Sequence, residues 1–266
     1  MKNFLINVCN KYHLLIVLKY DKIFYNAFGG EKMNVAAVLA GGSGTRMGTD
    51  IPKQFLEIEG VPVIIRSINA FIKHKDVDVC IVSVAQSYID YTNELIRRFI
   101  ETDKEIFVTS GGKTRSDTLF SVLQFMKKQG ILDGSIVLTH DAVRPFINDR
   151  IISDNIEAAK KYGACNTCIP AVDTMLLSDD GEFITAVPDR SRLFHAQTPQ
   201  SFDAAELYGL ITMLSPDVFS SLTDGCSVYS HSGKRVYMVK GENYNIKITY
   251  PDDIGRSENI IKQYFS

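Results

Sequence analysis

Residues 35–48, with the sequence VAAVLAGGSGTRMG, decide the expected fold. The opening residues are apolar and form a run short enough for a buried β-strand, and a glycine-rich turn follows at once. Glycines let backbone N–H groups approach a polyanion closely, because no Cβ stands in the way. Arg46 lies within this turn and Lys53 lies just beyond it, and both add positive charge. The segment therefore predicts a strand followed by a loop that holds a triphosphate.

Two common phosphate-binding loops do not match this sequence. No Gly-Lys-Ser/Thr closes the loop, as a Walker A sequence requires, and the dinucleotide fingerprint needs a helix that opens directly from its G-x-G-x-x-G turn. Gly42, Gly44 and Gly48 have a spacing that imitates the fingerprint, so a structural turn without a ligand is the alternative. Arg46, together with the sequence PKQF at 52–55, favours ligand binding.

The composition limits the classes to which the chain can belong. Its 266 residues, 45% of them hydrophobic, suffice for one substantial core. A net charge of −2 argues against nucleic acid as the main partner. The five cysteines are odd in number and scattered, which favours a reduced, cytoplasmic setting over a disulfide framework. Cys165 and Cys168 form a C-x-x-C without a second pair or a nearby His, and we expect them to be small strand side chains.

Residues 1–32 form a distinct N-terminal segment. They are rich in Ile, Leu, Phe and Tyr, but lysines interrupt them, and the longest apolar run, LLIVL at 14–18, is too short to span a bilayer. The segment also lacks the long apolar region and the cleavage site of a signal peptide. We therefore expect a non-catalytic extension at 1–32, with a membrane-surface helix as the alternative, and a catalytic domain at 33–266.

Strand-like and helical runs alternate along the catalytic domain. Strands are expected at 35–39, 77–84, 106–108 and 135–139, and helices at 63–74, about 88–102, about 116–128 and 149–162. This alternation predicts an α/β fold with a doubly wound, mostly parallel sheet. Ligands of such sheets bind beyond the carboxyl ends of the strands. The glycine-rich loop, a second Gly-Gly turn at 111–112 and Asp141 all follow strands, so we expect one shared site.

One region departs from the alternation. Residues 171–177 and 183–187 are β-rich and flank an Asp-Gly turn at 180–181. This predicted hairpin has too few apolar residues to form a domain of its own. We therefore expect an arm over about 171–193 that projects and pairs with another chain.

The loop sequence together with PKQF resembles the signature of the CTP-dependent polyol-phosphate cytidylyltransferases. Further blocks of this family follow in family order: GGKTRSDT at 111–118, HDAVRPF at 140–146, VDT at 172–174, QTPQSF at 197–202, LTD at 222–224 and NIKIT at 245–249. The resemblance covers residues 34–266. It implies a Rossmann-like nucleotidyltransferase fold, a homodimer formed through the β-arm, and CTP and a polyol phosphate as substrates, with no role for nucleic acid or membrane.

In cytidylyl transfer, a phosphate oxygen of the polyol phosphate attacks the α-phosphorus of CTP, and pyrophosphate leaves. The nucleophile is already an anion, so the expected machinery consists of cations and Mg²⁺ rather than a general base. Arg46 and Lys53 suit a triphosphate clamp. Lys247, within NIKIT, suits a third cation at the α-phosphate. The expected CTP-binding set is Leu39, Ala40, Gly41, Gly42, Ser43, Gly44, Thr45, Arg46, Lys53, Gly112, Arg115, Thr118, Asp141 and Lys247.

Asp141 is the expected metal ligand, because a carboxylate at a strand end beside a triphosphate can hold Mg²⁺ together with phosphate oxygens and water. The resemblance makes Arg190 the phosphate-binding arginine for the polyol phosphate and a catalytic residue. Asp173 and Thr174 are expected near the hydroxyls, while Asp141 and Arg144 complete the polyol site. Asp224 is either a second carboxylate or a helix cap.

Two polyol phosphates come into question. Variants within AGG at 40–42, within HDAVRPF and within LTDGC at 222–226 favour D-ribitol 5-phosphate, whose CDP-ribitol product would serve a teichoic-acid-like polymer. The alternative is 2-C-methyl-D-erythritol 4-phosphate, for isoprenoid synthesis. An inactive nucleotide-binding homologue is an alternative of another class, against which the intact cationic positions speak.

Overall fold

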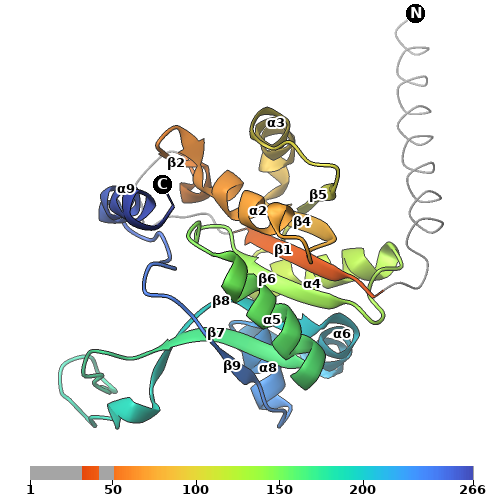
Figure 1. The fold of residues 1–266 in the computed structure, drawn as a ribbon. Coiled ribbons are helices and arrows are strands. Elements are labelled where there is room, and N and C mark those ends of the chain that lie inside the picture. Colours follow the sequence, from red (N-terminus) through yellow and green to blue (C-terminus); the bar gives the residue numbers. More distant parts are fainter. Residues whose placement is uncertain (1–31, 42–50, 266) are drawn as a thin grey trace, which may run out of the picture.

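The computed structural model describes residues 32–41 and 51–265 of the chain. Within these ranges the chain builds a seven-stranded mixed sheet with helices on both faces (Figure 1). In sheet order the strands are β5 (Glu105–Ser110), β4 (Val79–Val84), β1 (Asn34–Ala40), β6 (Ile136–Asp141), β8 (Phe194–Asp203), β7 (Ala164–Pro170) and β9 (Tyr237–Lys240). Nearly all of the predicted N-terminal extension and most of the glycine-rich loop lie outside the described residues.

The sheet is mostly parallel, as the alternation of strands and helices predicts. β1 pairs in parallel with both β4 and β6, and the pairs β4–β5 and β7–β9 are parallel as well. β8 runs antiparallel to β6 and β7. It reverses direction because the chain returns through it from the arm, and this return makes the sheet mixed.

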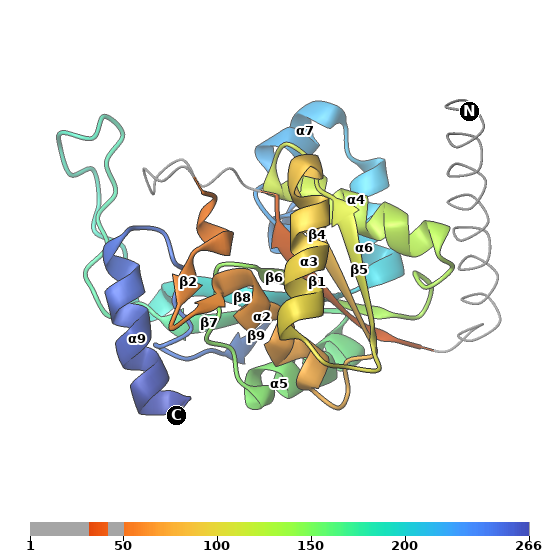
Figure 2. The same cartoon turned by 90° about the horizontal axis from the view of Figure 1, so that it is seen from above.

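The helices cover the sheet in two layers (Figure 2). They are α2 (Val63–Lys73), α3 (Ile89–Phe99), α4 (Arg115–Lys128), α5 (Asp149–Tyr162), α6 (Ala204–Met213), α7 (Pro216–Ser221) and α8 (Gly225–His231), whereas α9 (Asp252–Tyr264) packs beside β2. Successive side chains of β1 point to opposite faces. Those of Ala36 and Val38 pack with α2 and α5, whereas those of Val35 and Ala37 pack with α4, α6 and α8. The two faces thus form two cores.

A third, smaller core supports the segments that carry the site. Ile58 lies in a short hairpin of β2 (Glu57–Ile58) and β3 (Val61–Pro62), where it is buried with Phe146, Ile248 and side chains of α9. The backbone N–H of Ile248 donates to the carbonyl of Val143 at 2.9 Å. This core therefore holds the loop that follows β6 against the segment around residue 247.

The segment after β7 projects from the body, in teal at one end of the molecule (Figure 1). Its apolar side chains are exposed: 71% for Val172, 73% for Phe183 and 62% for Ile184. The predicted two-stranded hairpin is reduced to one antiparallel bridge between Leu177 and Ala186. The tip of this segment is held by a few hydrogen bonds, and its apolar side chains are not buried. Little packing therefore stabilises a longer ladder of strand pairs in the single chain.

None of the helices among the described residues is both long and apolar enough to cross a membrane.

Candidate active site

Asp141 ends β6 at the carboxyl edge of the sheet. In the register of the parallel pair it lies opposite Leu39 of β1, whose carbonyl accepts from the N–H of Ala142 at 3.0 Å. The N–H of Asp141 donates to Thr198 Oγ1 at 3.2 Å, which ties the strand end to β8. The carboxylate is nearly buried, with 10% of the side chain exposed. A charge held there must be balanced by neighbours.

Three cations balance it. Arg115 Nε lies 3.0 Å from Asp141 Oδ1, whereas Lys247 Nζ lies 2.9 Å and Arg144 Nε 3.7 Å from Asp141 Oδ2. Burial alone would raise the pKa of this carboxyl, but Arg115 and Lys247 outweigh it and hold the pKa well below its usual range. One carboxylate and three cations leave an excess of positive charge, which suits a polyphosphate.

The start of α4 places Arg115 against Asp141. Thr114 caps the helix: its side chain accepts from the N–H of Asp117, and the Asp117 side chain accepts from the N–H of Thr114. This reciprocal capping fixes the first turn of the helix, so the side chain of Arg115, the residue after the cap, has a defined direction. The pairing explains why Arg115, predicted to support the turn, instead points to the strand end.

The glycine-rich loop begins in contact with the second Gly-Gly turn. A Cβ on Gly41 would lie 2.7 Å from Thr118 Oγ1 and 3.4 Å from the carbonyl of Gly112. Thr118 Oγ1 also accepts from the N–H of Gly112 at 3.2 Å and donates to the carbonyl of Thr114 at 2.8 Å. Two of the predicted motifs therefore meet, with the hydroxyl of Thr118 between them.

Lys53 approaches from the other side of the same edge. It lies in the short 3₁₀ helix η2 (Lys53–Phe55), and its Nζ donates to the carbonyl of Ile248 at 2.9 Å. Ile248 follows Lys247, so both predicted lysines lie on one stretch of surface. Gln54 Nε2 donates to the carbonyl of Ala40 at 3.0 Å and ties this helix to the end of β1.

His140 supports the cluster from within. Its Nε2 donates to the carbonyl of Arg144 at 2.9 Å, and its Nδ1 accepts from Thr198 Oγ1 at 3.0 Å. Both ring nitrogens are satisfied in the neutral form, and burial lowers the pKa of the imidazole to about 4. His140 therefore holds the loop that carries Arg144, as a structural residue.

The structure brings some predicted residues together and leaves others apart. Leu39, Arg115, Arg144 and Lys247 lie beside Asp141, while Gly41, Gly112 and Thr118 meet one another at the start of the glycine-rich loop. Arg190 is exposed in the arm, where its Nη1 donates to the carbonyl of Val172 at 2.7 Å. Asp173 and Thr174 are also exposed, and within the described ranges no hydrogen bond or ion pair links the arm residues to Asp141. Gly42, Ser43, Gly44, Thr45 and Arg46 lie outside the described residues.

The described side chains do not form a ready-made metal site. They contain no group of three or more His, Cys, Asp or Glu residues placed to hold an ion. Both oxygens of Asp141 are engaged by cations, and Asp224 caps α8 through the N–H of Ser227 at 2.8 Å. In this arrangement the carboxylate of Asp141 holds three cations, and its role as a metal ligand beside a bound triphosphate stays a prediction.

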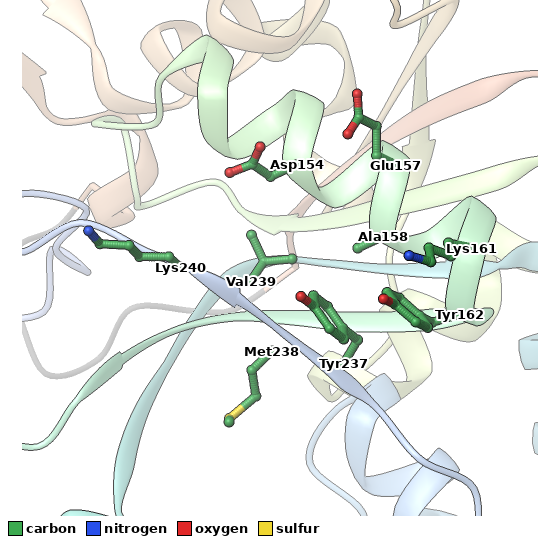
Figure 3. A pocket seen from close by; sticks show the side chains of 9 residues that line it. All are labelled: Asp154, Glu157, Ala158, Lys161, Tyr162, Tyr237, Met238, Val239 and Lys240. Atoms are coloured by element: carbon green, nitrogen blue, oxygen red, sulfur yellow. The ribbon is translucent and has the colours of Figure 1, made fainter.

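A groove of about 420 Å³ lies between α5 and the edge strand β9 (Figure 3). Tyr162 and Tyr237 stack there with ring centroids 4.3 Å apart. The charged side chains of Asp154, Glu157, Lys161 and Lys240 also line the groove, and none of the described site residues does. The groove is therefore separate from the predicted site at Asp141.

The comparison with known families agrees with this geometry. The family model described as IspD, 2-C-methyl-D-erythritol 4-phosphate cytidylyltransferase, matches residues 34–263. The chain belongs to this family.

Solved structures of the same kind share the fold. A 4-diphosphocytidyl-2C-methyl-D-erythritol synthase from Anaerococcus prevotii is 26% identical, with a TM-score of 0.73 over 87% of this chain and 96% of that one. The 2-C-methyl-D-erythritol 4-phosphate cytidylyltransferase from Thermus thermophilus is 25% identical, with a TM-score of 0.66 over 87% of this chain and 100% of that one. The protein is therefore a cytidylyltransferase, as the sequence motifs predict.

The family match favours the second of the two predicted substrates. The matched family and both of these structures are named for 2-C-methyl-D-erythritol derivatives, and none is named for D-ribitol 5-phosphate. Two of the variants that favoured ribitol, Val143 within HDAVRPF and Gly225 within LTDGC, are buried against the protein's own side chains. Gly225, for example, packs against the ring of Phe202, where a Cβ would lie 2.6 Å away.

Sequence reasoning missed several residues that hold the cluster. Thr198 and Gln200 alternate along β8 and are both buried, and Asn245 Nδ2 donates to the carbonyl of Thr198 at 2.9 Å. The signal available in the sequence was the pair of polar residues at i and i+2, which places both on one face of a strand. That spacing predicts a shared face, but not the partner that the face meets.

Proposed function

We propose that this cytidylyltransferase transfers the cytidylyl group of CTP to 2-C-methyl-D-erythritol 4-phosphate. The products are the CDP derivative of the polyol and pyrophosphate. The observation that carries the proposal is the cluster of Arg115, Arg144 and Lys247 around one buried carboxylate, in a chain that matches this family over 34–263.

The reaction is a displacement at phosphorus. An oxygen of the polyol phosphate forms a bond to the α-phosphorus, and the bond from that phosphorus to the bridging oxygen of the β-phosphate breaks. The electron pair leaves with pyrophosphate. Because the attacking oxygen is already ionised, proton removal is unnecessary, and the main obstacle is repulsion between two polyanions. Fixed cations lower it without reorganising during the reaction.

The described cations divide this work by position. Lys247 is held by Asp141 Oδ2 with 39% of its side chain exposed, so its ammonium group can contact the α-phosphate without losing its anchor. Lys53 lies beside it on the triphosphate side, through its bond to the carbonyl of Ile248. Arg46 is proposed to complete the clamp from the glycine-rich loop.

The polyol phosphate is proposed to bind residues of the arm. Arg190, Asp173 and Thr174 offer a guanidinium group, a carboxylate and a hydroxyl, which suit a phosphate and several hydroxyls. Since no hydrogen bond or ion pair among the described residues joins them to their own Asp141, we propose that they complete the site of a second copy of the chain.

The metal is proposed to arrive with CTP. Cytidylyltransferases of this family type generally use a divalent ion. The triphosphate supplies oxygen ligands for Mg²⁺, and the ion then forms part of the substrate. Its chemistry is to neutralise charge on the phosphates, while Lys247 and Arg115 keep their places around Asp141.

A reduced, cytoplasmic setting is also proposed. Cys80, Cys165, Cys168 and Cys226 are free cysteines. Burial raises the pKa of Cys80 and of Cys165 to about 12, so neither thiol is poised for redox chemistry at neutral pH.

The test is pyrophosphate release from CTP and Mg²⁺ with each polyol phosphate in turn. We expect kcat/KM for 2-C-methyl-D-erythritol 4-phosphate to exceed that for D-ribitol 5-phosphate by at least about tenfold, because a site that pairs one set of hydroxyls rejects a mismatched set. EDTA should abolish turnover without changing the melting temperature of the free protein. A preference for ribitol would overturn the substrate, and no release with either compound would overturn the proposal.

A further inference from the structure

Gln200 lies in β8 with only 2% of its surface exposed, between two charged groups of opposite sign. Its Oε1 accepts from Arg115 Nη2 at 3.3 Å, and its Nε2 donates to Asp224 Oδ2 at 2.6 Å. Nε2 also donates to Asn166 Oδ1 at 3.0 Å. The side-chain amide thus uses both of its N–H groups and its carbonyl.

The partners leave this amide one orientation. Asp224 is an acceptor on both oxygens, because its Oδ1 accepts from the N–H of Ser227 while its Oδ2 accepts from Gln200. Arg115 can only donate. Rotating the amide by half a turn would place its NH₂ against the guanidinium and its carbonyl against the carboxylate, with the loss of both hydrogen bonds.

Arg115 has few other ties. Its Nε donates to Asp141 Oδ1 at 3.0 Å, while its Nη1 is buried and has no hydrogen-bond partner among the residues that the structure describes. The bond from Nη2 to Gln200 therefore decides how the planar guanidinium group is turned when it meets Asp141. Asp141 Oδ2 accepts from Lys247. The orientation of Arg115 therefore affects the position of Asp141, and through it the position of Lys247 at the proposed α-phosphate site.

We propose that Gln200 is a positioning residue for CTP binding and transfer, which couples the carboxylate of Asp224 to Arg115 and through it to Asp141 and Lys247. As a neutral spacer it keeps Arg115 from pairing directly with Asp224, so the guanidinium group serves Asp141. The proposal rests on the CTP-binding role of this cluster in the proposed function, and it does not depend on which polyol phosphate is the second substrate.

Asp224→Asn tests the coupling with little change in shape. Asn caps helices as well as Asp does, so its one side-chain oxygen can keep the bond to the N–H of Ser227. Its NH₂ then faces Gln200 Nε2, two donors meet, and the amide of Gln200 can no longer serve both neighbours. We expect affinity for CTP with Mg²⁺ to fall about tenfold, the usual scale for a lost hydrogen bond to a charged group.

Gln200→Glu interrupts the same series of hydrogen bonds at its central residue. The introduced carboxylate places an oxygen against Asp224 Oδ2 and Asn166 Oδ1, where Gln200 Nε2 donates in the wild type, and this repulsion turns the side chain away from Arg115. We again expect a loss of about tenfold in CTP affinity. The double variant Asp224→Asn/Gln200→Glu restores a donor opposite an acceptor at each contact, and Asn166 can turn its amide to match. Its affinity should return to within about twofold of the wild type.

The measurement is isothermal titration of CTP with Mg²⁺ in the absence of any polyol phosphate, with the melting temperature recorded for every variant. Asp203→Asn is the matched control: Asp203 caps α6 through the N–H of Glu206, away from Arg115, and this variant should bind CTP as the wild type does. Rescue of CTP affinity in the double variant supports the proposal when the single variants keep melting temperatures close to the wild type, because a merely structural loss would lower the melting temperature as well.

Two results would overturn it. Either single variant could bind CTP like the wild type, or the double variant could stay as weak as the singles. Failure of the proposed function is separate and visible elsewhere: the wild type would then fail to release pyrophosphate with 2-C-methyl-D-erythritol 4-phosphate, whatever the variants do in the titration.

Discussion

Asp141 shows how one buried side chain can organise several charged neighbours. Its carboxylate is nearly buried, yet it is ionised, because Arg115 and Lys247 approach within about 3 Å and Arg144 lies behind them. Such a group is worth most when its partners are present, since removing one member of a buried pair leaves the other charge uncompensated. The cations, in turn, owe their fixed positions to this carboxylate.

Replacing Asp141 by Asn should therefore damage both stability and activity. Three cations lose their shared counter-charge, and we expect the free energy of unfolding to fall by about 2–4 kcal/mol. Turnover should fall at least about a hundredfold, because Lys247 is no longer held. Urea unfolding and pyrophosphate release measure the two effects.

Asp154→Asn is the matched control for this substitution. It breaks the exposed i,i+4 pair in which Arg150 Nη1 lies 2.7 Å from Asp154 Oδ2. Such pairs contribute under about 1 kcal/mol, so stability and turnover should hardly change. Near-normal turnover in Asp141→Asn would contradict the role assigned to the carboxylate.

His140 makes stability depend on pH. Its pKa is about 4 in the folded protein against 6.5 ordinarily, because the buried ring resists protonation. Between these values the unfolded chain binds the additional proton, so the stabilisation present above pH 6.5 is lost as the pH falls towards 4. From pH 7 to pH 5 the loss from this group should be about 2 kcal/mol, at 1.36 kcal/mol for each unit.

Urea unfolding of the wild type and of His140→Gln at pH 7 and pH 5 checks this expectation. The glutamine variant is less stable at pH 7 because it forfeits the bonds to Thr198 and Arg144. Its stability should nevertheless fall less steeply between the two pH values, since it has no imidazole to protonate. Equal slopes for the two proteins would show that His140 does not contribute to the acid sensitivity.

At the scale of elements, the site depends on the contact between the end of β1 and the start of α4. Gly41 allows it, because a methyl group there would press on Thr118 Oγ1. Gly41→Ala should push these elements apart and weaken CTP binding about tenfold, as a displacement of a few tenths of an ångström misplaces the loop. Calorimetric titration with CTP and Mg²⁺ measures the effect.

Gly209→Ala offers the matched comparison for this element contact. Gly209 lies inside α6 with nothing within 4 Å of an added Cβ. There alanine should stabilise the helix by about 0.5–1 kcal/mol and leave CTP binding unchanged. Wild-type affinity in Gly41→Ala would mean that the loop tolerates the displacement.

Much of the fold follows from local patterns in the sequence. The helix predicted at 149–162 has those bounds in α5, because Asn148 caps its start and Gly163, with φ of 82°, allows it to end. β1 and α4 also lie within a residue of their expected positions. Short apolar runs and capping residues suffice here, since each element is specified by its own neighbours in the chain.

The side-chain contacts within the site could not be predicted in the same way. The meeting of Arg115 with Gln200 joins residues 85 positions apart, and that of Lys247 with Asp141 spans 106. Such pairs depend on the packing of whole elements, which no local pattern encodes. The single bridge in the arm has the opposite cause: its β-rich sequence predicts strands, but no segment within 32–41 or 51–265 covers them.

At the scale of the whole molecule, the projecting arm is the feature that one chain leaves incomplete. Val172, Phe183 and Ile184 are exposed in a segment without a core, and Arg190 stands with them, apart from its own Asp141. Apolar surfaces of this kind usually mark an interface. A two-fold dimer in which each arm reaches the other subunit would bury them and deliver each Arg190 to the partner's CTP site.

Mixing two inactive variants tests this shared site. We expect Lys53→Ala and Arg190→Ala to be inactive separately, because each lacks one cation of every site. In a mixed dimer with exchanged arms, one site carries both lesions and the other carries neither. After random exchange of subunits, pyrophosphate release should recover to about a quarter of the wild-type rate. Lys53→Ala mixed with itself is the control. If mixing restores nothing in dimers whose exchange is verified by mass labelling, then Arg190 serves the pocket of its own chain.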